Sequence, residues 1–339
     1  MDSIALLQSD KTVRLSPIVY RLSSFAYRLS SKMRRITLLT NPDVCNLHCP
    51  LCFLNQRASG CREFGMGEMH IATALAAIEK YAAERDALGK CILREVIPST
   101  MGEPLLYSHF DELLEVCESL GIPLNLTTNG TFPGKWGSDA GMAALLHACS
   151  DIKISYLASE QFDDWNANVE KLLDMRKKLC ERDVVRDVVR DAANLANVSI
   201  QVTLHRKNLQ NIPELVLWAS SIGIDRIKWN PVVFLNVAPA ELKREYALNC
   251  ELDEIRHLIL DVSESCHSNL KNEGSLFMNM QPLHPSKLME DMSAEAFSRD
   301  AGTCPFADEI WILPDGSEDY CPSPERRYGD KNAMCCFIK

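Results

Sequence analysis

The sequence lacks long apolar runs, contains little glycine or proline, and has no excess of positive charge. No stretch reaches the roughly 20 apolar residues of a membrane-spanning helix, and the first residues lack a signal peptide's compact apolar region and cleavage site. Only 15 Gly and 16 Pro in 339 residues exclude collagen-like and low-complexity classes. The net charge of −10 argues against nucleic acid as a partner. With 46% hydrophobic residues, the chain is predicted to fold into one large or two smaller domains.

Cysteine is the residue type that stands out, with 14 in the chain. This density is well below that of a small secreted disulfide scaffold. Because no signal peptide or membrane span is visible, the sequence predicts a cytoplasmic protein, in which thiols stay reduced. So many thiols in a reducing compartment favour metal or redox chemistry over disulfide bonds.

Strands and helices are predicted to alternate from residue 36 onward. Six apolar runs are typical of buried strands: Ile36–Leu39, Leu93–Ile97, Leu124–Thr127, Ile152–Tyr156, Val198–Leu204 and Arg226–Trp229. Segments with helical patterns lie between and after them: Ala72–Leu88, Phe110–Leu120, Ala140–Ala148, Gln161–Cys180, Pro213–Ser220 and Leu252–Leu270. Repeated strand–helix units require crossovers and hence a parallel sheet. Six strands do not close an eight-stranded barrel, so the predicted class is α/β, a partial (β/α)6 TIM-type barrel that binds ligands at the C-terminal strand ends.

Changes of composition divide the chain into four predicted parts. Residues 1–35 form a basic N-terminal extension with an amphipathic helical segment at 17–33. The sheet-containing core is expected at 36–235 and a helical linker at 236–295. At 296–339 Cys, Pro and Asp-Gly turns replace helical periodicity, which indicates a small Cys-rich module.

The most informative stretch is the loop after the first predicted strand, where Cys45, Cys49 and Cys52 lie within eight residues. A structural zinc site takes four ligands and usually shows paired Cys-x2-Cys halves. His48 is available as a fourth ligand, but between two cysteines its approach to the same ion is cramped. A [4Fe–4S] cluster takes one thiolate per iron, so three cysteines leave one iron open. The spacing favours an iron–sulfur site, with zinc or unliganded thiols as alternatives.

The same loop resembles the signature of radical S-adenosylmethionine (SAM) enzymes, in which Cys-x3-Cys-x2-Cys is followed by an aromatic residue, here Phe53. Four further matches stand at the ends of later strands: Met101-Gly102-Glu103-Pro104, Thr127-Thr128-Asn129-Gly130, Asp151-Ile-Lys-Ile-Ser155 and Ile227-Lys-Trp-Asn230-Pro231. Met101 departs from the first Gly of the family's Gly-Gly-Glu-Pro type motif. The matches keep the family's order along the chain.

The resemblance implies a role for each matched residue. Three cysteines would hold a [4Fe–4S] cluster whose open iron binds the amino and carboxylate groups of SAM. Gly102 would let the backbone approach closely, and Glu103 would offer a carboxylate to the amino group of SAM. The other residues expected to contact SAM, at its carboxylate, ribose or adenine, are Phe53, Thr128, Asn129, Ser155 and Asn230.

A second cysteine pattern lies near the end of the sequence. Cys304 and Cys321 flank an Asp-Gly hairpin signal at 315–316 and are placed to meet across the turn. This arrangement resembles the opening half of a SPASM or twitch module, which holds an auxiliary iron–sulfur cluster. Only Cys335 and Cys336 follow, so a truncated, twitch-like module with one cluster is expected. Adjacent cysteines rarely bind one cluster together; a soft-metal or arsenic site at the last pair is the alternative.

The resemblance implies an enzyme that cleaves SAM reductively to a 5′-deoxyadenosyl radical and abstracts hydrogen from its substrate. The expected substrate is a small polar metabolite of the sugar, aminocyclitol or nucleoside type, because residues 1–35 are too short for a peptide-recognition domain and the Cys module is reduced. Maturation of a ribosomally made peptide is the alternative, and a non-catalytic iron–sulfur or zinc protein is a distant one. Flavodoxin or ferredoxin is the implied kind of electron donor. Cys61 is a candidate hydrogen donor, although a structural role is the simpler interpretation.

Overall fold

The computed structural model describes residues 34–57, 65–86, 88–98, 101–156, 164–185, 195–266, 269–277 and 309–319, together with residues 323, 325 and 328. Several predictions lie outside these residues. They concern the helix at 17–33, the hydrogen donor Cys61, and the four C-terminal cysteines, Cys304, Cys321, Cys335 and Cys336.

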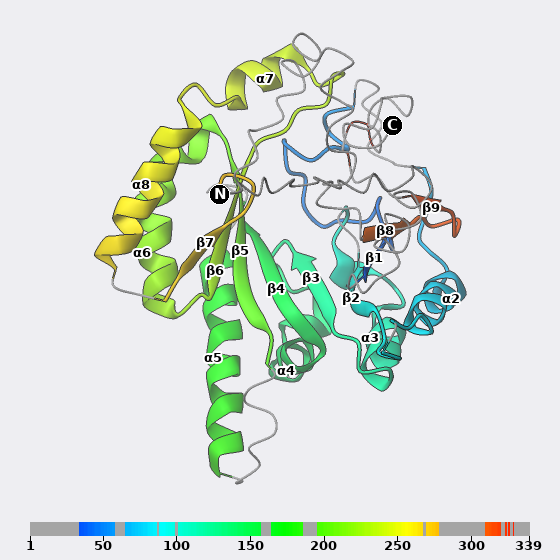
Figure 1. The fold of residues 1–339 in the computed structure, drawn as a ribbon. Helices are drawn as coiled ribbons and strands as arrows, with labels where there is room; N and C mark the ends of the chain where they lie inside the picture. Colours follow the sequence, from blue (N-terminus) through cyan, green and yellow to red (C-terminus); the bar gives the residue numbers. More distant parts are fainter. Residues whose placement is uncertain are drawn as a thin grey trace, which may run out of the picture.

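A single sheet runs through the described part of the chain, with its strands in the order β7-β6-β5-β4-β3-β2-β1-β8-β9 (Figure 1). The strands are β1 (Arg34–Leu38), β2 (Leu93–Pro98), β3 (Leu124–Thr128), β4 (Cys149–Tyr156), β5 (Asn197–Leu204), β6 (Arg226–Pro231), β7 (Lys271–Glu273), β8 (Glu309–Ile312) and β9 (Glu318–Asp319). All six predicted strands are therefore confirmed. Strands β1 to β6 pair in sequence order and in parallel, as expected of a partial TIM-type barrel.

Helices connect successive strands, as parallel pairing requires. They are α2 (Ile71–Ala82), α3 (Phe110–Ser119), α4 (Asp139–Ala148), α5 (Trp165–Val185), α6 (Ile212–Ile222), α7 (Ala240–Tyr246) and α8 (Leu252–Ser265). Short 3-10 turns occur at Pro104–Leu106, Gly134–Gly137 and Arg206–Asn211. The helical prediction is therefore confirmed for the described residues of each segment, with differences at some ends. Within the described residues, no helix is long and apolar enough to cross a membrane.

Two helices are shorter than the sequence predicts. Helix α2 ends at Ala82 instead of residue 88, because Arg85 bridges to Cys91 and the Asp86 carboxylate accepts the N–H groups of Leu88 and Lys90. Helix α8 ends at Ser265 instead of residue 270, since the chain goes on to form β7 beside β6. In both places, local turn chemistry or strand pairing replaces the helical hydrogen bonds.

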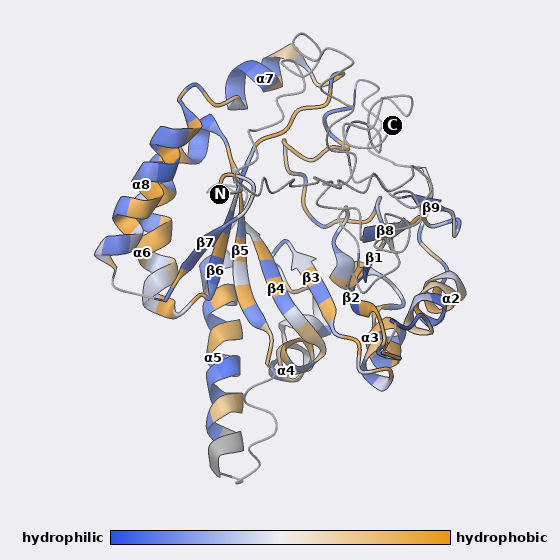
Figure 2. Cartoon of the chain, in the orientation of Figure 1, coloured by the Kyte–Doolittle hydropathy of each residue, from blue (hydrophilic) through white to orange (hydrophobic). Residues whose placement is uncertain are grey.

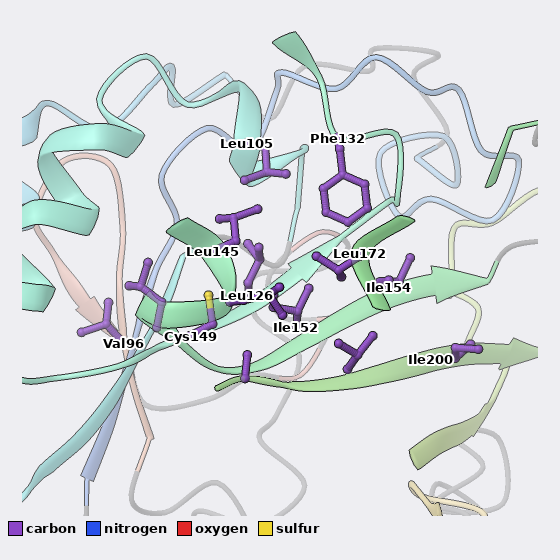
Figure 3. Close-up of a cluster of buried hydrophobic side chains, with 14 of the residues drawn as sticks. Val96, Leu105, Leu126, Phe132, Leu145, Cys149, Ile152, Ile154, Leu172 and Ile200 are labelled. Carbon is purple, nitrogen blue, oxygen red and sulfur yellow. The ribbon is translucent and has the colours of Figure 1, made fainter. Parts of the chain in front are cut away.

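The two faces of the sheet differ in chemistry. Apolar side chains of β2 to β5 pack against helices on one face, where Ile152, Ile154 and Ile200 meet Leu145 of α4 and Leu172 of α5 (Figure 3). Hydrophilic and hydrophobic residues alternate along β3 and β4 (Figure 2). Because successive strand residues point to opposite faces, the other face of the sheet is polar.

The predicted hairpin near the end of the chain is confirmed, and it joins the main sheet. Strand β8 pairs in parallel with β1, and the Leu39 N–H donates to the Ile312 carbonyl at 2.9 Å. A turn at Asp315-Gly316 then returns the chain antiparallel as β9. The predicted module boundary at residue 296 stays a prediction, but residues 309–319 continue the sheet of the core.

Candidate functional site

The three cysteines of the loop after β1 lie at the C-terminal end of that strand, as the sequence predicts. Cys45, Cys49 and Cys52 are all half-buried thiols. The loop folds back on itself, because the Cys52 N–H and the Asn55 side-chain amide both donate to the Cys49 carbonyl, at 3.1 and 2.6 Å. The backbone around these thiols is therefore held in a compact turn.

The start of this loop is bound to the turn after β2. The Glu103 N–H donates to the Val44 carbonyl at 2.8 Å, and the buried Asn41 amide donates to the Glu103 carbonyl at 2.7 Å. Gly102 has φ +73°, and a Cβ placed there would lie 2.1 Å from the Asn41 carbonyl oxygen. The close backbone approach expected at Gly102 is thus made to the chain's own loop.

Glu103 points inward, which differs from the expectation that its carboxylate faces SAM. The side chain is 1% exposed. One carboxylate oxygen accepts the Thr128 hydroxyl at 2.8 Å and the Leu105 N–H at 3.2 Å, and the other accepts the Asn129 N–H at 2.7 Å. Glu103 therefore joins the end of β2 to the end of β3, and Thr128 is engaged in that contact.

Burial raises the pKa of Glu103 to about 7, although the three donated hydrogen bonds act in the opposite direction. A folded-state pKa above the ordinary value near 4.5 means that the neutral carboxyl stabilises the fold. This contribution is complete below pH 4.5 and is lost as the pH rises through 7. We expect the free energy of unfolding to fall by about 3 kcal/mol across this window because of Glu103.

Urea unfolding at pH values from 5 to 8 measures this effect. The Glu103→Gln variant, which does not titrate, is the control, and its unfolding free energy should vary less with pH than that of the wild type. Parallel pH dependences of the two proteins would contradict the assignment.

Asn129 contacts the cysteine loop directly. Its side-chain amide lies 3.8 Å from the Cys45 sulfur and donates to the Asn46 side-chain oxygen at 2.8 Å. The side-chain oxygen of Asn129 accepts the N–H and the hydroxyl of Thr131. Asn129 was predicted to bind SAM, and in the structure its side chain reaches the first cysteine.

Several identified contacts shift the pKa of the Cys45 thiol. Burial raises its pKa, and the charges of Glu103 and Cys52 add to this, whereas hydrogen bonds from the Leu47 N–H and Asn129 lower it. Polar hydrogens directed at a sulfur are the contacts that stabilise a thiolate ligand of an iron–sulfur cluster. The net effect is a raised pKa, so the free Cys45 favours its neutral thiol, and the two hydrogen bonds are the contacts that would stabilise it as a thiolate ligand.

The three thiols of the loop match the three-cysteine donor set of an iron–sulfur cluster in which each thiolate binds its own iron. Within the residues that the structure describes, no group of three His, Cys, Asp or Glu side chains is arranged to hold a metal ion. His48, the other possible ligand in the loop, is exposed.

The cysteine loop packs against a small apolar cluster. This cluster is formed by Leu39, Leu54, Met101, Leu235, Ala238 and Tyr328, with Cys52 and Phe53 packed against it. The Phe53 ring stacks on Tyr328 with centroids 5.3 Å apart. Met101, which departs from the family's glycine, therefore fills this cluster, and the ring of Phe53 serves packing.

Gln56 anchors the end of the loop, a role that sequence reasoning missed. The side chain is fully buried, and its amide donates to the Leu51 and Val233 carbonyls while its oxygen accepts the Leu235 N–H. These bonds attach the cysteine loop to the segment after β6, and both lie at the same end of the sheet in Figure 1. No sequence signal marks Gln56, because Val233 and Leu235, the partners that fix its role, are 177 and 179 residues away.

Two further predicted SAM residues lie near the ends of β4 and β6. Ser155 is half-buried and makes no side-chain hydrogen bond within the described residues. The Asn230 side-chain oxygen accepts the N–H and the hydroxyl of Ser275, both at 3.1 Å. Asn230 is therefore partly engaged by the chain, whereas Ser155 keeps its hydroxyl for other contacts.

Comparison with known proteins identifies solved structures that share the fold of this chain. SuiB from Streptococcus suis, bound to its precursor peptide SuiA, superposes with a TM-score of 0.55 and 17% identity over 98% of this chain and 71% of that chain. SuiB bound to S-adenosylmethionine gives 0.54 and 17% over 91% and 67%. A structure of anSMEcpe with bound AdoMet gives 0.51 and 13% over 90% and 83%. No family model and no curated protein matches the sequence. At these identities, the comparison establishes a shared fold.

Proposed function

Starting from the radical SAM fold that this chain shares with SAM-bound proteins, we propose that it is a radical SAM enzyme that modifies a peptide. One observation carries the proposal: Cys45, Cys49 and Cys52 lie in a loop bound to the ends of β1 and β2, where a fold of this kind places its ligands. Asn129 from the end of β3 contacts the first of these thiols.

The chain's own residues have defined tasks in this proposal. Cys45, Cys49 and Cys52 would hold a [4Fe–4S] cluster, which would supply the electron for reductive cleavage of SAM. Asn129 and the Leu47 N–H stabilise the Cys45 thiolate. Gln56 and Asn41 hold the two ends of the loop in place.

The polar strand ends are left to orient SAM. Ser155 is the predicted residue with an uncommitted hydroxyl in the described chain, so it is the first candidate for the SAM carboxylate or ribose. Gly102 and Glu103 act indirectly, since their contacts go to the loop and to β3. We assign them the role of positioning the loop.

A peptide substrate is favoured over the small metabolite expected from the sequence. SuiB was solved with its precursor peptide, and the likeness to that complex extends over 98% of this chain. The structural similarity therefore extends beyond a minimal SAM-binding core. The similar protein, SuiB, is one that binds a peptide. The small metabolite keeps one observation in its favour: only four cysteines follow residue 300 for an auxiliary module.

Anaerobic reconstitution with iron and sulfide tests the proposal. The reconstituted chain is expected to form 5′-deoxyadenosine from SAM when reduced with dithionite, as measured by liquid chromatography and mass spectrometry. About four irons per chain indicate one cluster, and about eight indicate the auxiliary cluster as well. Absence of 5′-deoxyadenosine in an iron-loaded sample contradicts the enzyme assignment.

A second assay tests the substrate class. Synthetic peptides encoded by short reading frames beside the gene are added to the same assay. A peptide that loses two hydrogen atoms by cross-linking, or gains deuterium from heavy water by epimerisation, supports the proposal. Turnover of a sugar, aminocyclitol or nucleoside acid, with no peptide modified, returns the assignment to a small metabolite.

A further inference from the structure

The polar face of the sheet carries a lysine that the proposed chemistry does not use. Lys153 lies on β4, between Asp151 and Ser155 on the same face, whereas Ile152 and Ile154 point to the helices (Figure 3). In register, Thr127 of β3 and Ser199 of β5 are its neighbours. Lys153 thus precedes Ser155, the candidate SAM contact, by two residues on the same face of β4.

Three other basic side chains on this face are paired with acids. The ion pairs are Arg35 with Glu95 and Glu309, Arg226 with Glu273, and Lys228 with Asp151. Lys153 forms no ion pair or side-chain hydrogen bond within the described residues. A cation removed from bulk water without a direct partner is costly. The charges of Asp151 and Glu95 favour the charged form of Lys153 without forming an ion pair with it.

Lys153 is nevertheless accessible. Its side chain is half-buried, whereas Asp151 is 4% exposed and Ser199 is fully buried. Burial and the nearby charge of Lys228 together lower the pKa of Lys153 to about 8, although the charges of Asp151 and Glu95 act in the opposite direction. A further anion in contact with the ammonium group would favour its charged form.

Neutral hydrogen-bonding residues on the adjacent strands are in register with Lys153 and Ser155. Thr127 pairs with Lys153 in register, and Gln201 pairs with Ser155. The side chains of Thr127, Ser155 and Gln201 make no hydrogen bond within the described residues. One cation with uncommitted hydroxyl and amide groups on the adjacent strands is the donor set that a carboxylate requires.

We propose that Lys153 receives a carboxylate of the substrate on the polar face of the sheet, next to the SAM contact at Ser155. This inference rests on the proposed function and narrows its substrate to a peptide with an acidic side chain or a free C-terminus near the modified residue. The carboxylate of SAM is the other source of the same chemistry, and the experiment separates the two.

Competitive acetylation of the reconstituted full chain tests the inference without a variant. The rate at which acetic anhydride labels Lys153 is measured by mass spectrometry with N-acetylglutamate amide, with N-acetylglutamine amide, or with SAM alone. The glutamate probe is expected to slow labelling of Lys153 about tenfold at ten times its dissociation constant. The uncharged glutamine probe should not, and the exposed Lys90 is the internal control for reagent reactivity.

Two results would overturn the inference. If SAM protects Lys153 and the glutamate probe does not, Lys153 serves the cofactor. If no probe protects it, Lys153 binds no carboxylate. In Lys153→Gln, calorimetric binding of the glutamate probe should be lost while Lys153→Arg retains it, and equal binding by the Gln variant also contradicts the inference.

The inference and the proposed function can fail separately. Protection of Lys153 by the glutamate probe without 5′-deoxyadenosine formation leaves a carboxylate site on a protein of another function. Formation of 5′-deoxyadenosine without protection leaves the enzyme assignment intact and removes Lys153 from substrate binding.

Discussion

Replacing Cys49 with serine is expected to abolish both cluster assembly and SAM cleavage. A hydroxyl group is a poor ligand for iron, and the loop holds only three thiols for the cluster. Loss of an outer contact to a metal ligand already costs 10–100-fold, so loss of a ligand should lower 5′-deoxyadenosine formation by more than about 100-fold. Iron counting and the visible absorption of the reconstituted protein measure the loss of the cluster directly.

Two matched variants make this result specific. Cys91→Ser changes a half-buried thiol that donates to the Ala82 carbonyl, far from the loop in sequence and outside its contacts. His48→Ala removes the exposed imidazole between the cysteines. Both are expected to keep the iron content of the wild type. Retained iron in Cys49→Ser, or lost iron in His48→Ala, would favour a different ligand set.

Replacing Gly102 with alanine is expected to lower the free energy of unfolding more than the same replacement at a glycine in an uncrowded turn. The left-handed backbone at φ +73° costs an alanine about 1–2 kcal/mol. The added Cβ would also lie 2.1 Å from the Asn41 carbonyl and 2.7 Å from the Val44 carbonyl. Because both contacts are backbone atoms, the loop that carries the cysteines has to move.

Gly89→Ala separates backbone strain from the collision. Gly89 has φ +76° and nothing within 4 Å of an added Cβ, so it bears the strain alone. Urea unfolding should show a larger loss for Gly102→Ala than for Gly89→Ala, and the reconstituted Gly102→Ala should also hold less iron. Equal losses at the two positions would mean that the close approach at Gly102 does not matter.

The cysteine loop and the alternating core could be predicted because their signals are local. Three thiols in eight residues indicate a metal centre without knowledge of the fold, and apolar runs at Ile36 or Val198 indicate buried strands. The Asp315-Gly316 turn was likewise visible as a hairpin. The pairing of β8 with β1 was not, since it joins segments more than 270 residues apart.

The roles of the polar residues at the strand ends were predicted less well than their positions. Glu103, Thr128 and Asn129 do lie together, as their placement at consecutive strand ends predicted. Their side chains nevertheless satisfy one another and the cysteine loop. A buried carboxylate accepts the donors closest to it, and which donors are closest is set by the packing of the turns.

By itself, the sequence determined the order of strands and helices, the parallel sheet and the position of the three thiols, because each depends on residue spacing along a few turns of chain. The tertiary structure decided which side chains are already used. Asn41 and Gln56 hold the loop, Glu103 points inward, and Lys153 forms no direct ion pair among the described residues. Hydrogen bonds and ion pairs depend on distances of a few ångströms between residues far apart in sequence. Only the folded chain brings those residues together.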